Sequence, residues 1–113
     1  MADIAAITTK TLPPDWQVVR HMAVLREHLP ELQERYNVSW LGVFGSYVRN
    51  EQRDDSDLDV LVEFSVIPGL LKFVNLQYYL SDLLGVQVDL IHRSGLRPDR
   101  RITQHSLDEA VPV

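Results

Sequence analysis

The chain has 113 residues, 45% hydrophobic and 24% charged, a length that suits one domain with a substantial core and excludes two. Its formal net charge of −5 argues against stable binding to nucleic acid, and the absence of cysteine excludes disulfides and thiolate metal sites. Because no apolar run could span a membrane and the start lacks a signal-peptide pattern, we expect a cytoplasmic protein without a membrane partner.

The beginning of the chain predicts an irregular arm followed by an interrupted helix. Residues 1–12 show no sustained periodicity, so we expect a flexible N-terminal arm ahead of a single domain over residues 13–113. Apolar residues at helical spacing follow two prolines. Pro30 is expected to break this helix, because proline lacks an N–H and clashes with the preceding turn.

The rest of the chain alternates between strand and helix patterns. Apolar runs and turn residues predict strands over 38–44, 58–64 and 86–91, and helices over 46–50, 70–84 and 99–110. Ser46 is expected to cap the short helix, and Gly85 suits the end of the long one. This order predicts an α/β (α+β) fold in which a small mixed β-sheet is backed by helices.

A pair of small residues and a pair of acids lie between two apolar runs. Gly45-Ser46 ends the first run, and Asp57-Leu58-Asp59 opens the second after ten intervening residues. Side chains at positions i and i+2 of a strand point to the same face, so Asp57 and Asp59 should lie side by side. Two carboxylates that close repel each other unless a cation lies between them, and hard divalent cations prefer oxygen ligands. The pattern predicts a Mg²⁺ site.

A third acid, Asp89, lies within the apolar strand predicted over 86–91. An unpaired buried carboxylate is costly, which indicates a partner. If this strand neighbours the preceding one, Asp89 completes a cage with Asp57 and Asp59 that can hold the two Mg²⁺ ions of phosphoryl-transfer chemistry. We then expect Asp89 to help deprotonate the acceptor. The alternative is a carboxylate that faces solvent from an edge strand.

The turn between the two runs is a candidate phosphate site. Backbone N–H groups around Gly45 and Ser46 can bind anions, and a Cβ at Gly45 would keep the backbone away from phosphate oxygens. Arg49 could add a charge-assisted bond to a triphosphate, although surface pairing with Glu51 or Glu63 would explain it equally well. The chain lacks both common Gly-rich nucleotide-binding patterns, which leaves a P-loop or Rossmann reading without support.

Gly45-Ser46, the two acids of 57–59 and the later Asp89 together resemble the signature of the DNA polymerase β-like nucleotidyltransferase superfamily. More narrowly, residues 45–49 and 56–62 resemble the minimal nucleotidyltransferases of bacteria and archaea. The resemblance extends from about residue 38 to the C-terminal Glu-Ala-Val-Pro-Val. One departure is Asn50, where relatives commonly have glycine.

The resemblance implies a bare catalytic core that transfers a nucleotidyl group from ATP with Mg²⁺, using Asp57, Asp59 and Asp89. It further implies a toxin–antitoxin system in which the protein is the antitoxin and adds AMP to a tyrosine of a HEPN-domain toxin. Two alternatives remain open. One is transfer to a small molecule or RNA, with a partner chain or dimer mate completing the site, and the other is a catalytically idle antitoxin that acts by contact.

Overall fold

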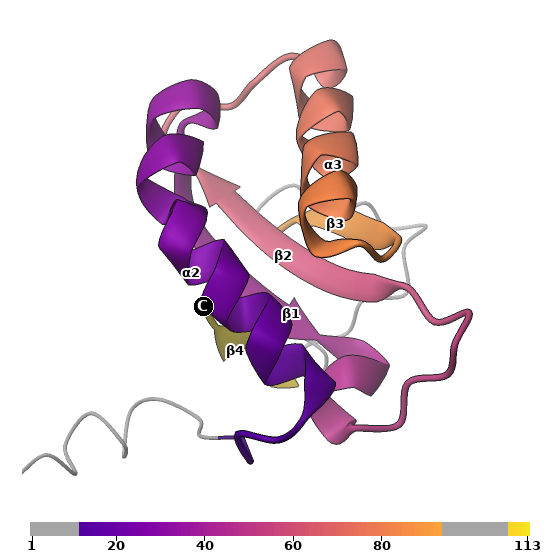
Figure 1. Ribbon diagram of the computed structural model, residues 1–113. Coiled ribbons are helices and arrows are strands. Elements are labelled where there is room, and N and C mark those ends of the chain that lie inside the picture. Colours follow the sequence, from indigo (N-terminus) through magenta and orange to yellow (C-terminus); the bar gives the residue numbers. More distant parts are fainter. Residues whose placement is uncertain (1–11, 94–108) are drawn as a thin grey trace, which may run out of the picture.

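The computed structural model describes residues 12–93 and 109–113, which form a four-stranded sheet with two long helices on one face (Figure 1). The elements are, in chain order, α2 (Gln17–Tyr36), β1 (Val38–Phe44), the 3₁₀ helix η1 (Gly45–Arg49), β2 (Leu58–Phe64), α3 (Leu70–Leu84), β3 (Val88–His92) and β4 (Val111–Pro112). This arrangement confirms the predicted fold class.

The sheet is mixed, with the strand order β3-β2-β1-β4. Strand β1 runs antiparallel to both β2 and β4, whereas β2 and β3 are parallel and are connected through α3. The register places Asp59 opposite Phe44 on one side and opposite Asp89 on the other. The predicted cage of three acids requires the strand of Asp89 to neighbour the strand of Asp59. This requirement is met, because β3 pairs directly with β2.

Alternate residues of the strands face two different apolar clusters. The cluster under α2 and α3 contains the fully buried strand residues Val43, Leu58, Val60, Val62 and Val88. A smaller cluster contains Phe44, Leu61, Ile91 and Ala110. Because Asp59 and Asp89 each lie two positions from a member of the smaller cluster, their side chains project from the face away from the helices.

The prediction that Pro30 breaks the first helix is wrong: α2 continues through Pro30 to Tyr36. Pro30 is exposed, so the carbonyl that loses its N–H partner lies on the solvent side. Leu25 and Leu32 are fully buried on either side of it, and their packing on the sheet holds the two halves in line. Asn37, with φ 58°, ends the helix as a left-handed cap.

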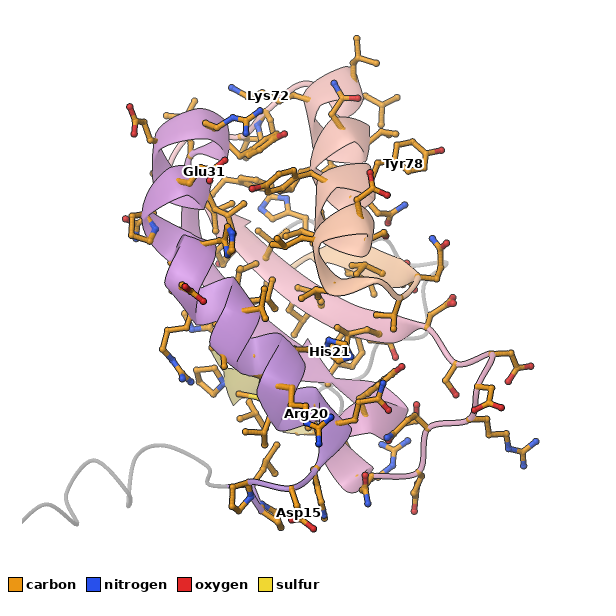
Figure 2. All side chains as sticks on the ribbon, in the orientation of Figure 1. Asp15, Arg20, His21, Glu31, Lys72 and Tyr78 are labelled. Atoms are coloured by element: carbon orange, nitrogen blue, oxygen red, sulfur yellow. The ribbon has the colours of Figure 1, made fainter. Side chains whose placement is uncertain are left out.

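Side-chain contacts tie the two helices together at one end. Glu31 projects from α2 toward α3 (Figure 2), where it accepts a 3.1 Å hydrogen bond from the Tyr79 hydroxyl and a 2.8 Å hydrogen bond from Arg35. The guanidinium of Arg35 also stacks on the Tyr36 and Tyr79 rings. No helix in the described part of the chain combines the length and apolar character that a membrane crossing requires.

The strands predicted over 38–44 and 58–64 and the helix over 70–84 are confirmed, including Gly85 as the C-terminal cap of α3. The third strand begins at Val88, two residues later than predicted. The arm predicted over 1–12 lies outside the described residues except for Leu12, and so does the helix predicted over 99–110 except for its last two residues. The sequence did not predict β4, which follows directly after Ala110.

Candidate active site

Three acids lie at one end of the two central strands. Asp59 is the second residue of β2 and Asp89 is the second residue of β3, and the two are direct partners in the parallel register. Neighbouring strands lie roughly 4.8 Å apart, so the two side chains leave the same face side by side. Asp57 precedes β2 by one residue and is exposed, whereas Asp59 and Asp89 are half-buried.

The pKa of Asp59 reflects the short distances between the three acids. The pKa of Asp59 is raised from 3.8 to about 6, mainly by burial and then by the carboxylates of Asp89 and Asp57, in that order of strength. The guanidinium of Arg49 acts in the opposite direction on the same carboxyl. Asp59 is thus the point where two other negative charges and one positive charge converge.

The donor chemistry of these acids fits Mg²⁺, because the ion prefers oxygen ligands and would relieve the repulsion between neighbouring carboxylates. Asp59 and Asp89 supply such oxygens from adjacent strand positions, and Asp57 from the residue before β2. Over residues 12–93 and 109–113, however, no three histidine, cysteine, aspartate or glutamate side chains are placed as a group that could hold a metal ion. The acids are neighbours in the fold, and their binding of Mg²⁺ stays a prediction.

Gly45 is required by the fold at this point for two reasons. Its φ of +80° lies in the left-handed region that favours glycine. A Cβ built on Gly45 would also collide with the carboxylate of Asp59, its nearest neighbour across the sheet end. The turn and the acid are thus packed directly against each other, a contact that the sequence did not predict.

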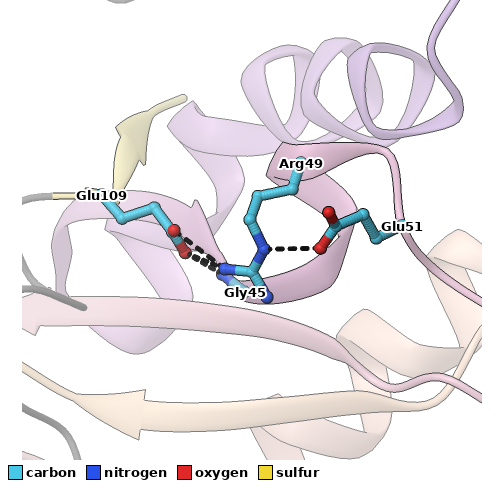
Figure 3. Close-up of polar contacts among 4 residues, drawn as sticks. All are labelled: Gly45, Arg49, Glu51 and Glu109. Atoms are coloured by element: carbon cyan, nitrogen blue, oxygen red, sulfur yellow. Dashed lines mark hydrogen bonds and ion pairs between the residues drawn. The ribbon is translucent and has the colours of Figure 1, made fainter.

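Arg49 is held by two carboxylates (Figure 3). Its Nη1 donates to both oxygens of Glu109, at 2.7 Å and 2.8 Å, and its Nε donates to Glu51 at 2.9 Å. Pairing with Glu51, which the sequence left open as an alternative, is therefore present. The backbone N–H of Gly45 also donates to Glu109, at 3.1 Å, so this group, which the sequence assigned to phosphate, has a carboxylate partner within the protein.

The prediction that Ser46 caps the short helix is wrong. Ser46 does not cap a helix, because it lies inside η1, whose N-terminal cap is Phe44 and has no side-chain hydrogen bond. Asn50 ends η1 with φ 55°, a left-handed conformation that asparagine tolerates better than most residues. Glycine, which adopts positive φ readily, would also suit this position.

Glu109 is the residue of this site that sequence reasoning missed. It lies 60 positions from Arg49 along the chain, in a segment predicted only as a helix. A Glu-Ala pair before the final Val-Pro-Val carries no pattern that points to a distant arginine. Only the pairing of β4 with β1, which brings the end of the chain beside the Gly45 turn, reveals the contact.

The sequence of the chain is similar to those of known proteins. The profile of a family described as the nucleotidyltransferase domain matches residues 25–108. A protein adenylyltransferase named MntA from Thermococcus cleftensis is 53% identical over 75 residues, which cover 66% of this chain and 76% of that protein.

Solved structures extend the similarity to the fold. A candidate minimal nucleotidyltransferase of known structure superimposes with a TM-score of 0.64 and 38% identity, covering 92% of this chain and 99% of that one. A complex of a tri-AMPylated HEPN toxin with its MNT antitoxin from Shewanella oneidensis contains a chain with a TM-score of 0.56 and 16% identity, covering 81% of this chain and 70% of that one. The last likeness concerns the fold alone.

Proposed function

The chain belongs to the nucleotidyltransferase domain family and is a nucleotidyltransferase, and from this premise we propose that it transfers AMP from ATP to a hydroxyl of a HEPN-domain toxin, as its antitoxin. The observation that carries the proposal is the pairing of Asp59 with Asp89 in register, beside Asp57. The name of the Thermococcus relative supports protein as the acceptor, and the Shewanella complex, which is similar in fold, supports the kind of partner.

In this proposal Asp57, Asp59 and Asp89 would hold Mg²⁺, which when bound supplies positive charge against the triphosphate and the leaving pyrophosphate. Asp89 accepts the proton of the acceptor hydroxyl and passes it to solvent. The hydroxyl oxygen then forms a bond to the α-phosphorus of ATP while the bond from that phosphorus to the bridging oxygen breaks. Pyrophosphate leaves with the electron pair, and the acceptor keeps AMP as a phosphodiester.

Gly45, Ser46 and Arg49 would bind the nucleotide. Gly45 lets the turn pass directly beside Asp59, so phosphates bound at the turn lie close to the acids. Ser46 is half-exposed and would contribute its hydroxyl, and Arg49 would contribute charge to the β- and γ-phosphates. The positive charge of Arg49 already acts on Asp59, which supports its place at the same site.

The placement of the acids suits a protein acceptor, and we propose a tyrosine hydroxyl as the group that receives AMP. Both α2 and α3 pack on the opposite face of the sheet, so neither helix stands between the acids and an approaching protein surface. An enzyme for a small acceptor usually surrounds it with a concave pocket. A partner protein instead brings its own surface to the site.

The test is incubation of the protein with its HEPN-domain partner, Mg²⁺ and ATP labelled at the α-phosphate. We expect label on the partner, and no label when the Asp57→Asn/Asp59→Asn double variant is used. The matched control is Asp54→Asn/Asp55→Asn, which removes two exposed loop carboxylates and the same charge, and should label normally. Label on RNA or a small molecule, rather than on the partner, would identify that molecule as the acceptor. A double variant that still neutralises the toxin fully would establish an antitoxin that acts by contact.

A further inference from the structure

Glu109 accepts hydrogen bonds from Gly45 and Arg49, two residues that we assign to the nucleotide site. One carboxylate oxygen accepts from both the Gly45 N–H, at 3.1 Å, and Arg49 Nη1, at 2.7 Å, and the second oxygen accepts from the same Nη1 at 2.8 Å (Figure 3). The side chain of Glu109 is 19% exposed, compared with 46% for Arg49. The Glu109 carboxylate is therefore more shielded from solvent than the guanidinium, and it accepts charge-assisted hydrogen bonds, which are stronger than neutral ones.

We infer that Glu109 is a positioning residue of the nucleotide site, which holds the Arg49 guanidinium and the Gly45 turn in the orientation that binds the triphosphate of ATP. The inference rests on the proposed function. An unrestrained arginine loses about 2 kcal/mol of rotamer freedom when it is fixed on a ligand. Glu109 restricts the guanidinium before ATP arrives, so less of that freedom remains to be lost on binding.

Among the described residues, the ion pairs of Arg49 leave one of its amino groups for a ligand. The two ion pairs use Nε and Nη1, so the Nη2 amino group belongs to neither of them. In Figure 3 this nitrogen lies on the side of the guanidinium away from both carboxylates. An arginine fixed in this way presents a defined N–H edge, which suits the planar recognition of phosphate oxygens.

The backbone around Glu109 is itself anchored, which favours a fixed support over a mobile arm. Ala110 is buried in the small apolar cluster, and Val111 pairs with Val43 in the register of β4 and β1. The strand β1 then leads directly into the Gly45 turn. Both ends of the contact between Glu109 and Gly45 are thus attached to the same pair of hydrogen-bonded strands.

Two rival roles for Glu109 predict different results. If its carboxylate merely occupied the place of a phosphate, ATP would have to displace it, and its removal would strengthen binding. If it only secured the end of the chain, its removal would lower stability and affect ATP binding regardless of Arg49. The affinity for ATP, measured with and without Arg49, therefore separates the three roles.

The experiment measures, for variants of the 113-residue chain, the dissociation constant of a non-hydrolysable ATP analogue with Mg²⁺ by calorimetry, and the melting temperature. We expect Glu109→Ala to weaken binding on the order of tenfold and Glu109→Gln to weaken it less, because glutamine can still accept from the Gly45 N–H. In an Arg49→Ala background, Glu109→Ala should weaken binding clearly less than in the parent, because only the contact with the Gly45 N–H is then lost. Glu109→Gln keeps the shape of the side chain and serves if the alanine variant does not fold.

The matched control is Glu51→Ala, which removes the other carboxylate on Arg49 and the same charge without touching Gly45. Glu51 is 66% exposed, so its loss should weaken binding by less than about twofold. Tighter binding by Glu109→Ala, or an equal loss in the Arg49→Ala background, would overturn the inference. A parent protein that binds no ATP analogue overturns the proposed function together with it, whereas unchanged affinity of Glu109→Ala in a binding-competent parent overturns this inference alone.

Discussion

The close packing of the Gly45 turn on Asp59 predicts that Gly45→Ala destabilises the protein more than Gly85→Ala. Both glycines have left-handed backbones, with φ of +80° and +70°. A Cβ at Gly45 would collide with the Asp59 carboxylate, whereas no atom of the described residues lies within 4 Å of a Cβ at Gly85. Gly85 is therefore a control that carries the backbone strain without the collision.

The magnitudes follow from these two terms. A left-handed backbone costs an L-residue about 1–2 kcal/mol, which is the whole effect expected at Gly85. At Gly45 the Asp59 side chain must also leave its preferred rotamer, which adds about 0.5–1.5 kcal/mol. We expect the free energy of unfolding to fall by about 1.5–3.5 kcal/mol for Gly45→Ala.

Urea unfolding of four proteins isolates the collision: the parent, Gly45→Ala, Asp59→Ala and the double variant. Once Asp59 lacks its carboxylate, the nearest remaining atom is its Cβ at 3.5 Å, an ordinary contact. The cost of Gly45→Ala should then shrink to that of Gly85→Ala. Equal costs at the two glycines in the parent, or a cost at Gly45 that persists without the carboxylate, would refute the reasoning.

Three further substitutions test the electrostatics and packing. Because the pKa of Asp59 is raised to about 6, the native state holds this proton more tightly than the unfolded chain, and stability is lost as pH rises from about 4 to 6. Asp59→Asn should therefore raise the unfolding free energy at pH 7 in a chelator by on the order of 1 kcal/mol, after allowance for solvent screening, and the gain should vanish near pH 4. His21 behaves oppositely, because burial lowers its pKa below 6.5, and its Nε2 is buried without a hydrogen-bond partner among the described residues. Stability that depends on neutral His21 is lost as pH falls below about 6.5, and the melting temperature of His21→Phe should depend less on pH between 7 and 5. Finally, a Cβ at Gly42 would overlap the Trp40 indole, so Gly42→Ala should cost about 1–3 kcal/mol and shift the Trp40 fluorescence measured in a Trp16→Phe background; an unchanged spectrum would contradict the contact.

The sequence by itself determined the features that depend on near neighbours along the chain. The spacing of Asp57 and Asp59 and the apolar runs around them specified strands β1 and β2, because a strand alternates its side chains every two residues. The apolar pattern and Gly85 likewise specified α3 and its end. The sequence also indicated the nucleotidyltransferase family, because the family signature is a local motif.

The tertiary structure decided whatever depends on residues far apart in the sequence. The register of β2 with β3, which sets Asp89 beside Asp59, follows from how the strands bury their apolar faces. The uninterrupted α2 reflects packing on both sides of Pro30, which outweighs the local preference of proline. The contact of Glu109 with Arg49 and Gly45 arises only when β4 pairs with β1, because a carboxylate finds its distant partners only after the chain has folded.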